Sequence, residues 1–505
     1  MFFKILLFTL TVAVFWWYGS VVLDPDFGWH LSIGEFIQTR GIPKTDPLSY
    51  TMPGYQFVDY EWLANSALSL LYPLIGFAGL SIIFAVFAAV ALFLQIHSEK
   101  RFIIIPLVIC ATTLLSFAGV RPQVISWLFF SLLLYVTLDN KRLKTWAFVI
   151  PFIFLLWANI HGGFPLGLVS LAIIFIGRML TRLKFQKDLT LILFLSILAT
   201  LINPYGIKLW HEIWAITSDG ALSGNIAEWM PMLFMPHLTF WYFFPFSVLF
   251  VIRYRNKFKS YEFFLFFVLL AAGLISRRHV PFFIILSLPL TIRSLNYLFE
   301  ETTAIAGASG RLAKANIIFS ILSFMVVAGQ LFLQHRTMLS YTENAFYPKK
   351  AVAYLKNHKS QGNLCSVYNW GGYLIWKLPE KKVCIDGRMP AWKQKETAVE
   401  SGNAFEEFQK LGAGDISLEH VATKYDIDTL LLPKLVKSDE KNLVTAISNI
   451  IQPLFHNTEK KRKYPSLETQ LVKSNWIKAY EDVVAVIYIK QKDQHIFPPL
   501  TKKEK

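Results

Sequence analysis

Long apolar blocks constrain the fold of this chain more than any other feature. Residues 5–23 carry no charge and are long enough to cross a bilayer core, which takes about 20 apolar residues. Ten further blocks follow, at residues 77–96, 102–118, 122–138, 146–160, 164–177, 189–202, 238–252, 261–276, 280–292 and 315–333. We expect an α-helical polytopic membrane protein with about eleven spans, in which one or two of the shorter segments could be re-entrant.

The formal net charge of +16 would fit a nucleic-acid partner, but the positions of the basic residues argue against one. With the N-terminus placed in the cytoplasm, 17 of the 23 Lys and Arg residues before residue 335 fall on the cytoplasmic side. This distribution is the positive-inside bias of membrane proteins. The basic charge is therefore interpreted as a topology signal, with membrane lipids as the surroundings and no nucleic acid bound.

An odd number of spans places residues 335–505 on the outer side, after a membrane domain of residues 1–334. No block in this segment is long enough to span a bilayer, and its pattern predicts a small extracytoplasmic α/β domain with a mainly parallel sheet. Cys365 and Cys384 lie there on two predicted neighbouring strands, and spacing alone leaves their pairing open. The expected helices are 348–359, 372–377 and one near 395–410, and the expected strands are 364–368, 382–386, 429–432 and 483–490.

Asp24-Pro25-Asp26 opens the first outer loop, residues 24–61, directly after the first apolar block. Short surface helices are expected at 30–38 and 63–75. One reading of the acidic motif is structural, because Asp caps helix N-termini and Pro suits a first turn. The other is chemical: a carboxylate could act as general base or hold a divalent cation. His30, four residues after Asp26, lies on the same helical face and could assist or merely form a hydrogen bond.

Outer-side charges elsewhere supply further candidates. Glu228, beside Trp229, could provide a second metal ligand or the base. Arg121, Arg277 and Arg278 are among the few outward basic residues, and guanidinium groups suit phosphate oxygens of either a substrate or a lipid headgroup. His161 is followed by two glycines that permit close approach, so it could line a site or bond the turn behind it.

In the outer domain, Trp370-Gly371-Gly372-Tyr373 follows a predicted strand, and Asp386-Gly387-Arg388 ends the next one. A turn at the carboxyl end of a strand is a common ligand-binding position. Trp370, Tyr373 and Arg388 are therefore candidates for acceptor binding, with packing or docking as the alternative.

These motifs, in this order and on this side, resemble the C-type (GT-C) membrane glycosyltransferases, in particular a poorly characterised bacterial branch. The resemblance rests on the run from Asp24 to His30, Arg121-Pro122, Asn159 with His161-Gly162-Gly163, Asn203-Pro204-Tyr205-Gly206, Glu228-Trp229, and the two outer-domain motifs. It implies a polyprenyl-phosphate-linked sugar as donor, an inverting transfer, a first-loop Asp as base and an Arg that holds the phosphate. Some members need a divalent cation such as Mg²⁺ or Mn²⁺ and others do not. No motif that reads a glycosylation sequon is identified here.

We therefore expect a glycosyltransferase on the outer face of a bacterial cytoplasmic membrane, with a glycan, lipid or protein as acceptor. Asp24, Asp26 and Glu228 are the candidate catalytic or metal-binding acids. The candidate substrate-binding residues are His30, Arg121, His161, Trp229, Arg277, Arg278, Trp370, Tyr373 and Arg388. Two alternatives stay open: a transporter or flippase of lipid-linked sugars, and a non-catalytic assembly protein that anchors the outer domain.

Overall fold

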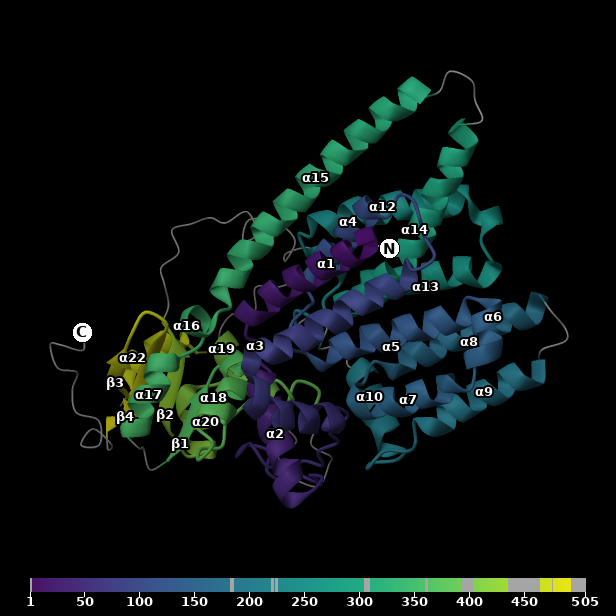
Figure 1. The fold of residues 1–505 in the computed structure, drawn as a ribbon. Coiled ribbons are helices and arrows are strands. Elements are labelled where there is room, and N and C mark those ends of the chain that lie inside the picture. The colour runs from purple at the N-terminus through teal and green to yellow at the C-terminus, as the bar shows by residue number, and fades with distance from the viewer. Residues whose placement is uncertain are drawn as a thin grey trace. The chain divides into compact units, whose positions relative to one another are not determined.

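The fold consists of a large helical part and a smaller part built around a sheet (Figure 1). The computed structural model describes residues 2–181, 186–218, 222, 226–303, 309–358, 362–392, 403–434, 464–474 and 476–491. It divides into two compact units: a helical unit of Met1–Val22 and Leu71–Leu339, and a mixed unit of Leu23–Leu70 and Ser340–Lys505. The first loop thus packs with the C-terminal domain, whereas the sequence-based division assigned it to the membrane domain.

Each of the eleven apolar blocks forms a helix, as their composition predicts. These helices are α1 (Phe2–Val21), α3 (Trp62–Gln95), α4 (Ile104–Leu115), α5 (Pro122–Thr137), α7 (Val149–Ile160), α8 (Phe164–Thr181), α9 (Gln186–Ala199), α12 (Leu238–Arg253), α13 (Ser260–Ile275), α14 (Val280–Thr303) and α15 (Ser309–Ser340). Between them lie α6 (Asn140–Trp146), α10 (Lys208–Ser218), and the 3-10 turns η1 (Met232–Phe234), η2 (Arg255–Lys257) and η3 (Arg277–His279).

Within the described residues, four helical segments are long and apolar enough to cross a membrane: Phe2–Val21, Trp62–Gln95, Arg277–Thr303 and Ile317–Ser340. The pair α5 and α6, bent by 108°, would make a fifth. Six other apolar helices have 10–17 residues each, which is short for a bilayer core of about 30 Å. The expected total of about eleven spans stays a prediction.

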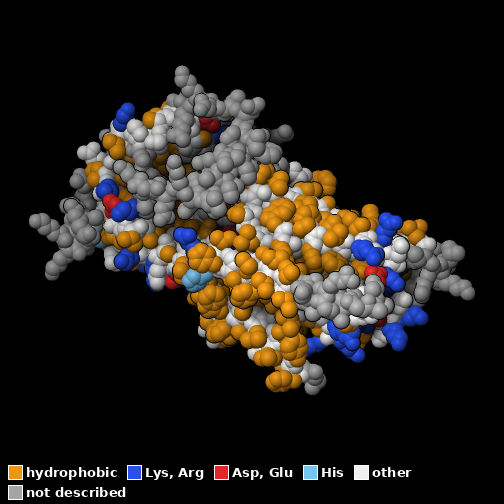
Figure 2. Space-filling view, turned by 90° about the horizontal axis from the view of Figure 1, so that it is seen from above, with side chains coloured by type: hydrophobic (Ala, Val, Ile, Leu, Met, Phe, Trp, Pro, Cys, Tyr) orange, Lys and Arg blue, Asp and Glu red, His pale blue; other side chains and the backbone are white. Residues whose placement is uncertain are grey.

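The surface of the helical unit is apolar. Phe148, Leu180, Trp214 and Phe324 are each more than 70% exposed. Figure 2 shows hydrophobic side chains covering much of the middle of one face, with Lys and Arg mostly outside this apolar area. Exposed apolar surface of this extent is what a lipid-facing bundle requires.

Helix α3 joins the predicted surface helix 63–75 to the predicted span 77–96. The break between them is Gly76, whose φ of 65° lies in the left-handed region that glycine adopts without steric cost. The chain can therefore change direction there without a separate loop.

The mixed unit contains a four-stranded sheet in the order β1-β2-β4-β3, formed by β1 (Asn363–Ser366), β2 (Ile427–Pro433), β3 (Trp476–Glu481) and β4 (Ala485–Lys490). Only β1 and β2 are parallel, and the pairs β2–β4 and β3–β4 are antiparallel. The prediction of a mainly parallel sheet is therefore wrong. Its cause is the unpredicted strand β3, which forms a hairpin with β4 around Asp482, whose Oδ1 accepts the backbone N–H groups of Val484 and Ala485.

The predicted strand 382–386 is also wrong. Only Val383 makes a bridge there, and its partner is Ser49 of the first loop. The remaining elements are α2 (Phe27–Arg40), α16 (Glu343–Phe346), α17 (Lys349–Asn357), η4 (Tyr368–Trp370), α18 (Gly371–Lys377), α19 (Ala404–Ala413), α20 (Leu418–Lys424) and α22 (Leu467–Lys473). Helix α2 contains the predicted surface helix 30–38. The first part of the helix expected near 395–410 lies outside the described residues.

Candidate functional site

The acidic motif forms a tight turn at the start of α2. Asp24 is buried, and its Oδ1 accepts the backbone N–H of Asp26 at 2.8 Å. The backbone N–H of Phe27 then donates to the Asp24 carbonyl. Asp26 is the N-cap residue by position, but its side chain makes no capping hydrogen bond. The hydrogen bond to the Asp26 backbone supports the structural reading for Asp24, and the chemical reading of the two acids stays a prediction.

His30 lies in a buried hydrogen-bond chain. Its Nδ1 is 2.6 Å from Oδ1 of Asn65, and Nδ2 of Asn65 donates to both carboxylate oxygens of Asp59. Glu61 lies 3.8 Å from the same imidazole nitrogen. Burial raises the pKa of Asp59 to about 6, although Asn65, the Glu61 backbone and Arg388 all act in the opposite direction. This series of hydrogen bonds fixes α2 against the beginning of α3.

The outer-domain candidates are engaged within the mixed unit. Trp370 donates its indole N–H to the Phe346 carbonyl, and the Tyr373 hydroxyl donates to Glu343. The Arg388 side chain is 3% exposed and donates to Asp386 and Asp46 at 2.7–2.8 Å. Desolvation would raise the pKa of Asp46, but Arg388, with Ser49 and the Leu48 backbone, lowers it. These contacts support the packing alternative for all three residues.

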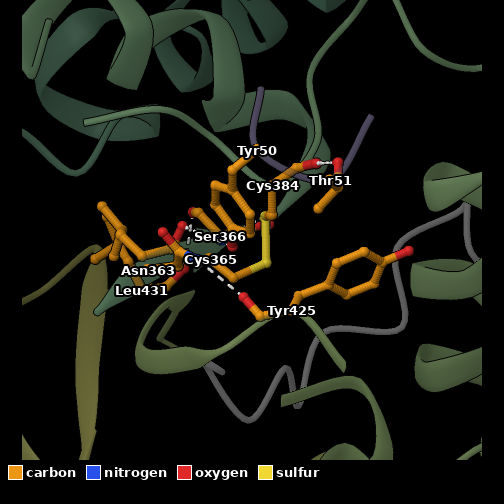
Figure 3. The surroundings of a disulfide bond; sticks show 9 residues. Tyr50, Thr51, Asn363, Cys365, Ser366, Cys384, Tyr425 and Leu431 are labelled. Carbon is orange, nitrogen blue, oxygen red and sulfur yellow. Dashed lines mark hydrogen bonds between the residues drawn. A yellow bond between two sulfur atoms is a disulfide. The ribbon is translucent and has the colours of Figure 1, made fainter. Parts of the chain in front are cut away.

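Cys365 and Cys384 form a disulfide within the mixed unit (Figure 3). Thr51 of the first loop donates to the Cys384 carbonyl, and Tyr50 donates to the Leu364 carbonyl beside the other cysteine. The disulfide therefore ties β1 to a segment that also contacts the first loop. A disulfide suits an oxidising compartment, which agrees with the predicted outer location of this domain.

A second cluster of predicted site residues lies in the helical unit, where the ends of several helices meet. Arg121 stands before α5, and Nη1 donates a short hydrogen bond to Oε1 of Glu228. The backbone N–H of Arg278, in η3, donates to the Glu228 carbonyl, and that of Arg277 to the Met230 carbonyl. The Arg278 guanidinium also lies 5.1 Å from the Trp229 ring.

The charge of Glu228 is set by these arginines. Desolvation would raise the pKa of its carboxyl, but Arg121, Arg278 and Arg277 outweigh that effect and lower it. An ionised carboxylate with a depressed pKa is a weak base. The ion pair with Glu228 also orients the Arg121 guanidinium, and the catalytic role of Glu228 stays a prediction.

His161 follows α7, and both of its ring nitrogens lie within hydrogen-bond distance of fixed groups. Trp157 donates to Oγ of Ser126, and the same Oγ lies 2.7 Å from Nδ1 of His161. The backbone N–H of Gly163 donates to the same nitrogen at 3.0 Å. A Cβ atom on Gly163 would lie 2.9 Å from this nitrogen, so glycine allows the close approach.

Nε2 of His161 lies 3.0 Å from Nη2 of Arg278. A guanidinium N–H can only donate, so Arg278 donates to Nε2 when the imidazole proton is on Nδ1. The guanidinium groups of Arg121, Arg277 and Arg278 lie around Glu228, and guanidinium groups suit the oxygens of an anion such as phosphate. The cluster is therefore chemically suited to phosphate.

The predicted site residues thus fall into two groups. The helical unit brings together Arg121, His161, Glu228, Trp229, Arg277 and Arg278, and the mixed unit contains Asp24, Asp26, His30, Trp370, Tyr373 and Arg388. Among the residues that the structure describes, no group of three or more His, Cys, Asp or Glu side chains is arranged to hold a metal ion. The metal site of Asp24, Asp26 and Glu228, with Mg²⁺ or Mn²⁺, stays a prediction.

Sequence reasoning missed the residues that orient these groups. Ser126 and Trp157 lie inside apolar blocks, where nothing distinguishes them from packing residues. Asn65 and Asp59 are separated from His30 by about 30 residues. Among the residues that orient the site, only Gly163, in the glycine pair after His161, was recognised from the sequence.

No protein-family model and no curated protein matches this sequence. Several solved structures match this chain in fold. AglB, an archaeal oligosaccharyltransferase from Archaeoglobus fulgidus in complex with an inhibitory peptide and a dolichol-phosphate, matches with a TM-score of 0.53 and 12% identity, over 86% of this chain and 70% of AglB. ArnT from Cupriavidus metallidurans, bound to undecaprenyl phosphate, matches with a TM-score of 0.50 and 12% identity, over 96% of this chain and 97% of ArnT.

The apo structure of the same ArnT gives a TM-score of 0.51 over 98% of this chain and 99% of ArnT. This chain has the GT-C fold. The match over nearly the full length of ArnT includes the C-terminal domain, so the GT-C fold here extends beyond the helices. Together with the apolar helices, the GT-C fold makes this chain a multi-pass membrane protein.

Proposed function

We propose that this chain is a glycosyltransferase that moves a sugar from a polyprenyl-phosphate carrier to an acceptor on the outer face of a bacterial cytoplasmic membrane. The observation that carries the proposal is the gathering of Arg121, Arg277 and Arg278 around Glu228, since three guanidinium groups beside one carboxylate suit the phosphate of such a carrier. The ligands named for the similar structures, dolichol-phosphate and undecaprenyl phosphate, are of this chemical class.

In this proposal Asp26 is the general base. Its carboxylate takes the proton from an acceptor hydroxyl, whose oxygen attacks the anomeric carbon of the sugar. The bond from that carbon to the phosphate oxygen breaks, and polyprenyl phosphate leaves with an added negative charge. Arg278, with Arg121 and Arg277, stabilises this charge, and an inverting transfer results.

The test uses membranes of a deletion strain, which retain the unused lipid-linked sugars and their acceptor. Purified protein is added, and loss of sugar from the lipid-linked pool is followed by mass spectrometry. We expect wild type and Glu35→Gln, an exposed acid on the same helix α2, to consume the pool. Loss of a general base typically lowers a rate by about 10²–10⁴-fold, so Asp26→Asn should show almost no transfer.

The phosphate site is tested separately by native mass spectrometry with undecaprenyl phosphate. Arg278→Gln should weaken binding about tenfold or more, because a charge-assisted hydrogen bond is lost. Arg255→Gln, an exposed arginine of η2, should bind as wild type does. The proposal fails if wild type consumes no lipid-linked sugar, or if Asp26→Asn transfers at the wild-type rate.

A further inference from the structure

Three short segments of the mixed unit interlock at the acidic turn. A Cβ atom on Gly387 would overlap Oδ1 of Asp26 and lie 2.8 Å from its Cγ. A Cβ atom on Gly372 would overlap the Pro25 carbonyl oxygen, and one on Gly28 would overlap the Gly372 carbonyl oxygen. The glycines of the two outer-domain motifs are therefore required where the acidic turn packs against them.

The close contacts at Gly372 and at Gly387 constrain different parts of the acidic turn. Gly372 meets backbone atoms of Pro25, so it sets where the turn lies. Gly387 meets the carboxylate of Asp26, the movable end of a side chain, so it sets where that carboxylate lies. A larger residue at Gly387 would displace the carboxylate and leave the backbone in place.

The segment that contains Gly387 is held by several contacts. Asp386 is fully buried, and its Oδ1 accepts both the backbone N–H and Nε of Arg388. Cys384, two residues earlier, is bonded to Cys365 of β1. A Cβ atom on Gly371 would lie 2.7 Å from Cβ of Asp386, so α18 packs against the same segment. Gly387 thus belongs to a rigid support.

We infer that residues 384–388 of the C-terminal domain position the Asp26 carboxylate, with Gly387 as the positioning residue. The C-terminal domain is then a working part of the catalytic apparatus, in addition to any role in acceptor binding. The inference rests on the proposed function, in which Asp26 is the base.

The decisive variant is Gly387→Ala, tested in the deletion-strain membrane assay. A displacement of about 1 Å can lower a rate about 10²-fold. We therefore expect kcat to fall at least tenfold, with little change in the donor concentration that gives half the maximal rate. Gly412→Ala and Gly54→Ala are matched controls, because a Cβ atom there meets nothing within 4 Å. Both should stay within twofold of wild type.

A double variant separates positioning from general disruption. If Gly387 acts through Asp26, adding Gly387→Ala to Asp26→Asn should lower the residual rate no further. Gly387→Ala with a wild-type kcat would overturn the inference while leaving the proposed function intact. Additive losses in the double variant would also overturn it.

Chemical modification of the Asp26 carboxyl group tests the contact with Gly387 independently of catalytic turnover. A water-soluble carbodiimide with an amine modifies accessible carboxyl groups, and peptide mass spectrometry reports the modification of Asp26. Gly387→Ala should change the modification rate of Asp26 several-fold, whereas Gly412→Ala and Gly54→Ala should not. Equal rates in all four proteins would refute the contact, whether or not the protein proves to be a transferase.

Discussion

Replacing Arg388 tests most sharply whether the outer-domain motif Asp386-Gly387-Arg388 serves the fold or a ligand. The Arg388 side chain is buried and is bonded to Asp46 and Asp386, whose side chains are 0% exposed. Arg388→Met keeps the volume but leaves two buried carboxylates without their shared cation. Removing one partner of a buried ion pair costs about 3–5 kcal/mol. For a domain of this size that corresponds to a loss in melting temperature of roughly 10 °C.

The assay is thermal unfolding of the detergent-solubilised protein at several pH values. Arg388 holds the pKa of Asp46 below its ordinary range, so without Arg388 burial raises that pKa. The carboxyl then becomes protonated as the pH falls, and the deficit of Arg388→Met should shrink from pH 8 to pH 5. Arg40→Met is the matched control, because Arg40 is exposed at the end of α2, and it should change stability by no more than about 0.5 kcal/mol.

The reasoning is refuted if Arg388→Met melts like Arg40→Met at every pH. If that stable variant also lost transfer activity, Arg388 would be a ligand-binding residue after all.

Further predictions concern three other groups. Burial raises the pKa of Asp59 in the folded protein from 3.8 to about 6. Burial of this carboxyl group therefore leaves the free energy of unfolding unchanged below pH 4 and lowers it by about 3 kcal/mol above pH 6. Asp59→Asn should flatten this pH dependence, measured as the melting temperature. Cys365 and Cys384 are 19 residues apart, so reduction of their disulfide should lower stability by about 3 kcal/mol, measured by unfolding with and without reductant. Glu228→Gln should bind undecaprenyl phosphate as well as wild type or up to about fivefold more tightly, since one negative charge is removed at a half-exposed pair. Loss of transfer with unchanged binding would instead make Glu228 the base.

The sequence predicted the helices well because their signal is local. An apolar block needs only its own composition to become a helix in a membrane-protein fold, and all eleven did. The charge pattern likewise located Arg121, Arg277 and Arg278 as candidates, and they lie in one cluster with His161 and Glu228. The positions of these residues in the sequence were sufficient to select them.

The parts that could not be predicted depend on contacts between distant residues. Strand β3 has the sequence WIKAYE, which lacks the regular alternation of apolar and polar residues in a half-buried strand, and it pairs with β4 across the Asp482 turn. The roles of Arg388 and Gly387 depend on contacts with first-loop residues more than 300 positions away in the sequence. Motif reading left acceptor binding and packing open for the segment that contains both, because the association of the first loop with the C-terminal domain leaves no local trace.

The most direct test of the central claim is the fate of lipid-linked sugar when Asp26 is changed. In deletion-strain membranes, purified wild type should consume the lipid-linked pool, while Asp26→Asn, folded and able to bind undecaprenyl phosphate, should leave it untouched. An Asp26→Asn protein that empties the pool as fast as wild type would contradict the assignment of the base and, with it, the proposed mechanism.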